Sequence, residues 1–116
     1  MADVETRVEL TCLLDFYGPL LTEHRREVMR LYCEEDYSLA EIATELGITR
    51  QGVHDAVSKS QAQLEGYEQK LGLIARYQRL MKAMADCRAA LTEVQPAGGT
   101  EDRLKSAIRL LDEMEP

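Results

Sequence analysis

Residues 38–58 read SLAEIATELGITRQGVHDAVS and carry the start, stop and turn signals of two short helices. Ser38 and Glu41 match a capping box, in which the serine accepts from the third helical N–H and the glutamate accepts from the N–H of the cap. Apolar residues then recur at spacings of three and four, which predicts a helix that ends at Gly47. Thr49 is a suitable N-cap for a second helix. The stretch is therefore predicted to form a helix-turn-helix motif.

The second helix of this motif divides into an apolar and a polar side. Val53, Val57 and Leu64 fall on the side that is expected to face the core. The other side is polar near the start of the helix and carries Arg50, Gln51, His54, Asp55 and Ser58. In a helix-turn-helix the second helix enters the major groove of DNA. The polar side is therefore the first candidate for a nucleic-acid-binding surface.

The composition of the 116-residue chain favours an all-α fold. Ala, Leu, Glu, Arg and Gln abound, β-branched residues are sparse, and there is no Trp and one Phe. A chain of this length is expected to form one domain with a modest core. No apolar run approaches the roughly 20 residues that span a bilayer, and the opening MADVETRVEL lacks the apolar centre of a signal peptide. We therefore expect a cytoplasmic protein with no membrane partner.

Helical patterns continue on both sides of the motif. They predict an N-terminal helix over 4–17 and a helix over 23–34, which completes a tri-helical core with the two helices of the motif. The last of these is expected to extend beyond the motif, with Gly66 and Gly72 as points where it can bend or break. The predicted organisation is a helix-turn-helix domain with long helical extensions over 1–95, a linker over 96–100 and a C-terminal amphipathic helix over 101–116.

From Leu73 the apolar residues follow a heptad pattern. Their spacing alternates between four and three residues, at Leu73, Tyr77, Leu80, Met84, Cys87, Leu91 and Val94. About three heptads of this kind are typical of a helix that packs along its length on another helix. Two alternatives stay open. The helix packs on the N-terminal helix of the same chain, or it forms a homodimer through Leu73, Tyr77, Leu80 and Met84.

The net charge of −7 argues against a protein that coats nucleic acid with its whole surface. Residues 22–70, which include the motif, carry six basic and ten acidic side chains. Any binding to DNA must then rest on a local surface made by Arg25, Arg26, Arg50 and Lys59. We expect such binding to be weak or strongly dependent on salt.

Several polar side chains of the motif have a chemistry that suits DNA. Arg50 presents a planar fork that matches guanine O6 and N7, and Gln51 can both donate to and accept from adenine. Thr49 lies at a helix N-terminus, where free N–H groups suit a phosphate. His54 can contact a base or a phosphate, whereas Asp55 repels phosphate unless it orients Arg50 or accepts from cytosine. The alternative for each residue is a solvated position on an amphipathic helix.

Arg25 and Arg26 lie in the first turn of the preceding helix, where contact with a phosphate is plausible. The predicted nucleic-acid-binding residues are thus Thr49, Arg50, Gln51, His54, Asp55, Ser58, Arg25 and Arg26. The sequence has no Gly-rich phosphate loop, no H-E-x-x-H and no convincing Ser/His/Asp arrangement. Cys12, Cys33 and Cys87 form no C-x-x-C pair and lie in helical patterns, so they are expected to act as small apolar residues. We therefore predict no enzyme, no cofactor and no metal.

Three segments resemble the YlxM-like family of helix-turn-helix proteins associated with the signal recognition particle pathway. They are DFYGPLLTEHRREVMRLY at 15–32, DYSLAEIATELGITRQGVHD at 36–55 and LEGYEQKLGL at 64–73. The middle segment is also similar to region 4 of sigma factors and to response-regulator output domains. FYGPLLT and YEQKLGL make the narrower assignment, and the resemblance covers about residues 14–80.

The resemblance implies a sigma region 4-like fold, nucleic-acid binding and a regulatory or accessory role in the signal recognition particle pathway. It carries over Arg50, Gln51 and Asp55 as recognition-helix positions. The family usually has Ala-Val-Tyr where this chain has Gly52-Val53-His54, which costs roughly 1 kcal/mol of helix propensity at the glycine. The alternative is a non-enzymatic module that binds a protein of the pathway or its RNA through the same fold. The acidic balance favours that alternative.

Overall fold

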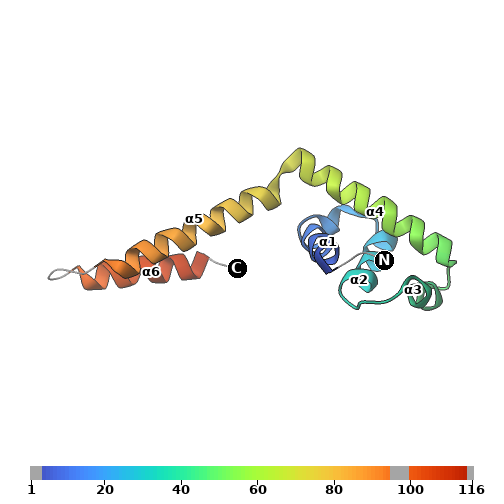
Figure 1. Cartoon of the computed structure of the whole chain (residues 1–116), viewed down its shortest axis with the longest axis horizontal. Coiled ribbons are helices and arrows are strands. Elements are labelled where there is room, and N and C mark those ends of the chain that lie inside the picture. The colour runs from blue at the N-terminus through green and yellow to red at the C-terminus, as the bar shows by residue number, and fades with distance from the viewer. Residues whose placement is uncertain (1–3, 95–99, 115–116) are drawn as a thin grey trace. The chain divides into compact units, whose positions relative to one another are not determined.

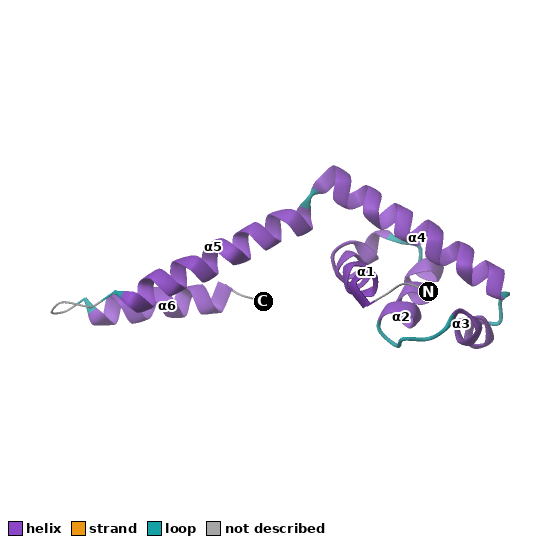
Figure 2. Ribbon diagram, in the orientation of Figure 1, coloured by secondary structure: helices purple, strands orange, loops and turns teal. Residues whose placement is uncertain are grey.

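The computed structural model describes residues 4–94 and 100–114, and all the regular structure within them is helical (Figures 1 and 2). The elements in order are α1 (Val4–Tyr17), a 3-10 turn η1 (Gly18–Leu20), α2 (Glu23–Cys33), α3 (Leu39–Leu46), α4 (Arg50–Leu71), α5 (Leu73–Glu93) and α6 (Glu101–Met114). The all-α prediction is confirmed. The predicted linker over 96–100 lies outside the described residues except for Thr100. Among the described helices, none combines the length and the apolar character needed to cross a membrane.

The chain divides into two compact units, Met1–Ile74 and Ala75–Pro116. The division falls near the start of α5, whereas the sequence suggested a linker near residue 96. In the first unit, α1, α2 and α3 all pack on α4 (Figure 1). The predicted tri-helical core is therefore present, and α1 adds a fourth helix to it. The most deeply buried large side chains of this core are Leu10, Tyr17, Val28, Met29, Ile42, Val53 and Leu64.

The local signals of the helix-turn-helix motif act as predicted. Ser38 Oγ accepts from the Glu41 N–H at 3.1 Å, and Glu41 Oε1 accepts from the Ser38 N–H at 3.1 Å. Gly47 ends α3 with φ = 67°, a left-handed conformation that a side chain would strain. Thr49 Oγ1 caps α4 by accepting from the Gly52 N–H at 3.0 Å. These caps fix where each helix of the motif begins and ends.

The end of α4 is held by a buried hydrogen-bond network. The helix runs through Gly66 without a break and ends at Gly72, where φ is 60°. Tyr17, only 1% exposed, donates its hydroxyl proton to Glu68 Oε1 at 2.5 Å and accepts from the Leu73 N–H at 3.1 Å. The Ile74 N–H also donates to Glu68 Oε1, at 3.0 Å. Tyr17 and Glu68 therefore satisfy two N–H groups in the first turn of α5, which have no partner within that helix.

Replacing Tyr17 by phenylalanine should lower the melting temperature by roughly 3–8 °C, because the Leu73 N–H and the Glu68 carboxylate each lose a buried partner. The measurement is thermal unfolding followed by circular dichroism, with amide hydrogen exchange at Leu73 as a local readout. Phe16→Leu, next to Tyr17 but without a hydroxyl to lose, is the control for disturbed packing. Unchanged exchange at Leu73 would show that the hydroxyl does not hold this N–H.

Burial and the neighbouring Glu68 carboxylate raise the pKa of the Tyr17 phenol above its usual value. A group whose pKa is raised on folding stabilises the folded chain below its unfolded pKa and loses that contribution as the pH rises through the folded pKa. The contribution of Tyr17 is therefore complete at neutral pH and disappears only in strongly alkaline solution.

In the second unit, α6 returns alongside α5 in the opposite direction (Figure 1). Arg88 Nε lies 2.8 Å from Asp112 Oδ1 and links the two helices. The predicted amphipathic helix is present as α6, and its apolar face, with Leu104, Ala107, Ile108 and Leu111, is partly buried. The helices thus form a hairpin joined through residues outside the described ranges.

Candidate nucleic-acid interface

The first turns of α4 present a row of polar side chains on a firmly anchored helix. Val53 is fully buried and Ala56 is 8% exposed, so one side of these turns is fixed in the core. The polar residues predicted for the opposite side are all exposed: Arg50, Gln51, His54, Asp55 and Ser58. A rigid helix with exposed polar side chains is the arrangement by which helix-turn-helix proteins read base edges.

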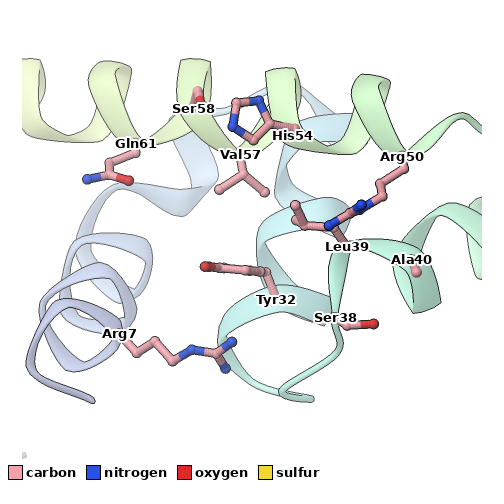
Figure 3. A pocket seen from close by; sticks show the side chains of 10 residues that line it. All are labelled: Arg7, Tyr32, Ser38, Leu39, Ala40, Arg50, His54, Val57, Ser58 and Gln61. Atoms are coloured by element: carbon pink, nitrogen blue, oxygen red, sulfur yellow. The ribbon is translucent and has the colours of Figure 1, made fainter. Parts of the chain in front are cut away.

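A groove of about 460 Å³ runs beside this row (Figure 3). We call it the α4 groove. Its lining consists of Arg50, His54, Val57, Ser58 and Gln61 from α4, Ser38, Leu39 and Ala40 at the start of α3, Tyr32 from α2 and Arg7 from α1. In Figure 3 the hydroxyl end of Tyr32 points into the space between α4 and the other helices. Three of the predicted site residues, Arg50, His54 and Ser58, therefore line the same groove as Arg7 and Tyr32, which the sequence did not suggest.

Gln51 and Asp55 belong to the exposed row but do not line the α4 groove. Gln51 Nε2 donates to Asp55 Oδ1 at 3.0 Å. The two residues are four positions apart, so their side chains are neighbours on the same face of the helix. Asp55 Oδ1 also lies 3.8 Å from His54 Nδ1. The structure therefore pairs Asp55 with Gln51, whereas the sequence suggests Arg50 as the side chain that Asp55 orients.

Thr49 is engaged in capping α4, since its hydroxyl oxygen accepts from the Gly52 N–H. Gly52 fits closely under this cap. A Cβ atom at position 52 would stand 3.1 Å from Thr49 Oγ1, tighter than ordinary van der Waals contact. The absence of a side chain at Gly52 therefore leaves room for the Thr49 cap. This favourable contact partly offsets the low helix propensity of glycine.

Arg25 and Arg26 are not brought to the α4 groove. Arg25 Nη1 donates to Gln63 Oε1 at 2.8 Å, and Gln63 lies thirteen residues beyond Arg50, or roughly 20 Å along the helix axis. Arg26 donates to the carbonyl oxygens of Gly18 and Pro19 at 3.2 and 3.1 Å. Both guanidinium groups thus have partners within the chain that hold them at the far side of the first unit from residue 50.

Arg7 is the functional candidate that reasoning from the sequence missed. Its side chain is 18% exposed, forms an ion pair with Asp36 and lies 4.9 Å from the centre of the Tyr32 ring. A guanidinium over an aromatic ring is attracted by the ring's electron-rich face. The available signal was that Arg7 is the single basic residue among four acidic ones in 1–21. Its position at the groove depends on how α1 packs, which the pattern of α1 did not specify.

The surroundings of the α4 groove are acidic. Residues 1–74 hold seven basic and fourteen acidic side chains, so Arg7, Arg50 and His54 form a local basic site on a negatively charged unit. Asp36 and Asp55 lie next to these groups and partly offset them. Any polyanion bound here must therefore be held by a few close contacts, and its affinity must fall with salt in proportion to the small number of phosphates that are contacted.

The thiols of Cys12 and Cys33 line a second groove, between α1 and α2. Burial raises the pKa of both thiols above the ordinary value. They are therefore protonated at neutral pH, which disfavours nucleophilic or metal-ligand chemistry. Within residues 4–94 and 100–114, no cluster of His, Cys, Asp or Glu side chains has the arrangement of a metal site.

Comparison with known proteins identifies relatives over most of the chain. The UPF0122 protein STH1464 of Symbiobacterium thermophilum is 46% identical over 91 residues, which cover 78% of this chain and 82% of that protein. The UPF0122 proteins GK1195 of Geobacillus kaustophilus and BH2485 of Halalkalibacterium halodurans are 36% and 34% identical over 112 residues, or 97% of this chain and 99% of each relative.

A family model described as "Putative helix-turn-helix protein, YlxM / p13 like" matches residues 4–98. The match reaches well beyond the segment 14–80 that carried the resemblance in the sequence, and it includes α1 and all of α5. It confirms the YlxM-like assignment and the helix-turn-helix character of the fold. The chain belongs to the UPF0122 family of YlxM/p13-like helix-turn-helix proteins.

Proposed function

We propose that this protein binds duplex DNA through the first turns of α4 and the α4 groove. The observation that carries the proposal is the row of five exposed polar side chains on a helix that is capped by Thr49 and anchored by Val53. In this geometry the row enters the major groove, and the start of α3 and Arg7 approach the neighbouring phosphates.

The residues divide into readers of bases and holders of phosphate. The hydrogen bond that Gln51 donates to Asp55 fixes the amide of Gln51, so that its remaining N–H and its carbonyl oxygen are directed before binding. Arg50 contacts guanine or a phosphate at the edge of the α4 groove, and His54 and Ser58 extend the same edge. Arg7 contributes a second guanidinium once its pairing with Asp36 is exchanged for a phosphate. Arg25 and Arg26, which the sequence suggested, have a secondary role at most.

A regulatory or accessory role of this cytoplasmic, non-enzymatic protein in the signal recognition particle pathway is part of the proposal, and it rests on the family resemblance. The acidic first unit supports a second candidate function. Fourteen acidic side chains against seven basic ones suit a protein partner with a basic surface better than they suit a polyanion. In that case the same fold binds a protein of the signal recognition particle pathway. Binding to the RNA of that pathway is a further form of this alternative.

A titration across salt concentrations separates these functions. With labelled duplex DNA we expect log K to fall linearly with log salt at a slope of roughly −2 to −3, since two or three cationic groups face the α4 groove. The measurement is fluorescence anisotropy, repeated with the RNA of the signal recognition particle. An absence of DNA binding at about 50 mM salt, or an affinity that does not change with salt, would exclude the DNA proposal. Tighter binding to the RNA would favour the RNA-binding variant, and binding to neither nucleic acid would favour a protein partner.

A further inference from the structure

The α5–α6 hairpin leaves most of its apolar surface uncovered. Among the described residues of the second unit, Met84 at 5% exposure is the only buried side chain. Four large apolar side chains remain at least half exposed, namely Leu80 (50%), Val94 (51%), Leu110 (57%) and Met114 (63%). Two helices can cover only one side of each other, so a hairpin of this length does not enclose a core. A further layer is needed to bury this surface.

The heptad pattern of α5 separates into two rows in the structure. Met84 is buried and Leu91 is partly buried, and they form the row that α6 covers next to the Arg88–Asp112 pair. Leu80, Cys87 and Val94 are exposed and, at seven-residue spacing, form a second nearly straight row. The small, exposed residues Ala83 and Ala90 lie between them and complete a 3-4 repeat. Such a repeat, with small residues opposite large ones, allows a second helix to pack closely.

The exposed apolar residues of α6 lie on the same side of the hairpin as this row. On α5 the exposed row precedes the covered row by roughly 70° of helical rotation, and on α6 Leu110 and Met114 precede the covered Leu104 and Leu111 by roughly 90°. Because α6 runs antiparallel to α5, residue positions turn around the two helices in opposite senses when both are viewed from one end. The two helices also face each other from opposite sides, and this second reversal cancels the first. Both rows therefore turn to one face, which we call the hairpin face.

The charges that flank the hairpin face on α5 change sign along the helix. The first half carries the exposed Arg76 and Arg79, and the second half carries the exposed Asp86 and Glu93. Arg79, Asp86 and Glu93 are spaced by seven and follow the edge of the exposed row that α6 does not cover. Such flanking charges determine which partner and which orientation a helix accepts.

From this arrangement we propose that the hairpin face binds a second copy of the chain, with the two α5 helices antiparallel. In that orientation Arg79 of each copy lies opposite Glu93 of the other, and the two-fold axis passes near Asp86 and Cys87. A parallel pair would instead place Arg79 against Arg79 and Glu93 against Glu93, which is repulsive, whereas Asp86 faces its own copy in either orientation and does not distinguish them. Leu110 of α6 lies near the same axis and packs on its own copy. The dimer does not depend on the proposed DNA binding and is tested without nucleic acid.

Sedimentation equilibrium of the full chain measures the dissociation constant of the dimer. Leu80→Asp should raise it at least tenfold, because a carboxylate would be buried at the interface against Val94 of the second copy. Gln78→Asp places the same residue on the exposed opposite side of α5, only two positions earlier, and should leave the constant within about twofold. Far-UV circular dichroism checks that both variants keep their helices. A monomeric wild-type chain, or an equal response to both substitutions, would overturn the proposal.

A charge exchange tests the orientation with surface changes that leave the fold intact. Arg79→Glu and Glu93→Arg should each weaken the dimer at least threefold, and the double variant should recover the wild-type constant within about twofold, because the opposed charges are restored. Lys105→Glu, on the other face of α6, should leave it unchanged. Failure of the double variant to recover would rule out the antiparallel pairing.

Discussion

Replacing Ile42 by alanine should lower the free energy of unfolding by about 2–5 kcal/mol, which is a large part of the stability of a chain of this size. Ile42 is fully buried and is the only buried side chain of α3, a helix of eight residues. A helix this short is not stable by itself and depends on tertiary packing. The substitution therefore leaves a cavity and also removes the main anchor of α3, which supports the turn into α4.

Urea denaturation followed by circular dichroism measures this loss as a lower midpoint at an unchanged slope. The matched control is Leu20→Ala, which removes the same three carbon atoms from a side chain that is 54% exposed. We expect that control to cost less than about 1 kcal/mol. Similar losses in both variants would contradict the central place of Ile42 in the core.

Replacing Arg50 by alanine should weaken binding to duplex DNA by roughly 5- to 150-fold, equivalent to about 1–3 kcal/mol. Arg50 is exposed, lies in the first turn of α4 and lines the α4 groove, so in the proposed complex it is the first cation of the helix to meet a base edge or a phosphate. If its role is a base contact, the preference between DNA sequences should also decrease. If it holds only a phosphate, all sequences should weaken equally and the salt slope should fall by about 1.

Lys70→Ala is the matched control for this experiment. Lys70 is also exposed on α4, but it lies twenty residues from Arg50, or roughly 30 Å along the axis. Its loss changes the net charge by the same amount and should change the affinity by less than about threefold. Arg7→Ala should weaken binding without altering sequence preference, because the proposal assigns Arg7 to a phosphate and not to a base. If Arg25→Ala weakens binding as much as Arg50→Ala, the interface extends along α2.

The boundaries of the helices could be read from the sequence because their causes are local. The capping box of Ser38 and Glu41, the left-handed Gly47 and the cap at Thr49 each involve residues no more than four positions apart. The break at Gly72 has the same kind of cause, since φ = 60° is readily available to glycine. Such signals act before any tertiary contact forms.

The candidate site could be predicted only on the helix that carries it. The exposed row of α4 follows from the helical period and from the burial of Val53. Arg7 and Tyr32 could not be assigned to the same groove, because they reach it from helices whose crossing depends on packing along the whole core. For the same reason, nothing in the sequence showed that Arg25 bonds Gln63, 38 residues away.

The heptad pattern of α5 shows where the sequence alone leaves the partner open. Burial of apolar surface has no direction, so the same row of residues fits another helix of the chain or a second copy. The structure places Met84 under α6 and leaves Leu80 exposed, which divides a single pattern into two faces. The sequence by itself determined the helices, their caps and the polar row of α4, since these depend on neighbours within a turn or two. Only the tertiary structure decided which cations share a groove and which apolar row remains for a partner, because both depend on contacts between residues far apart in the chain.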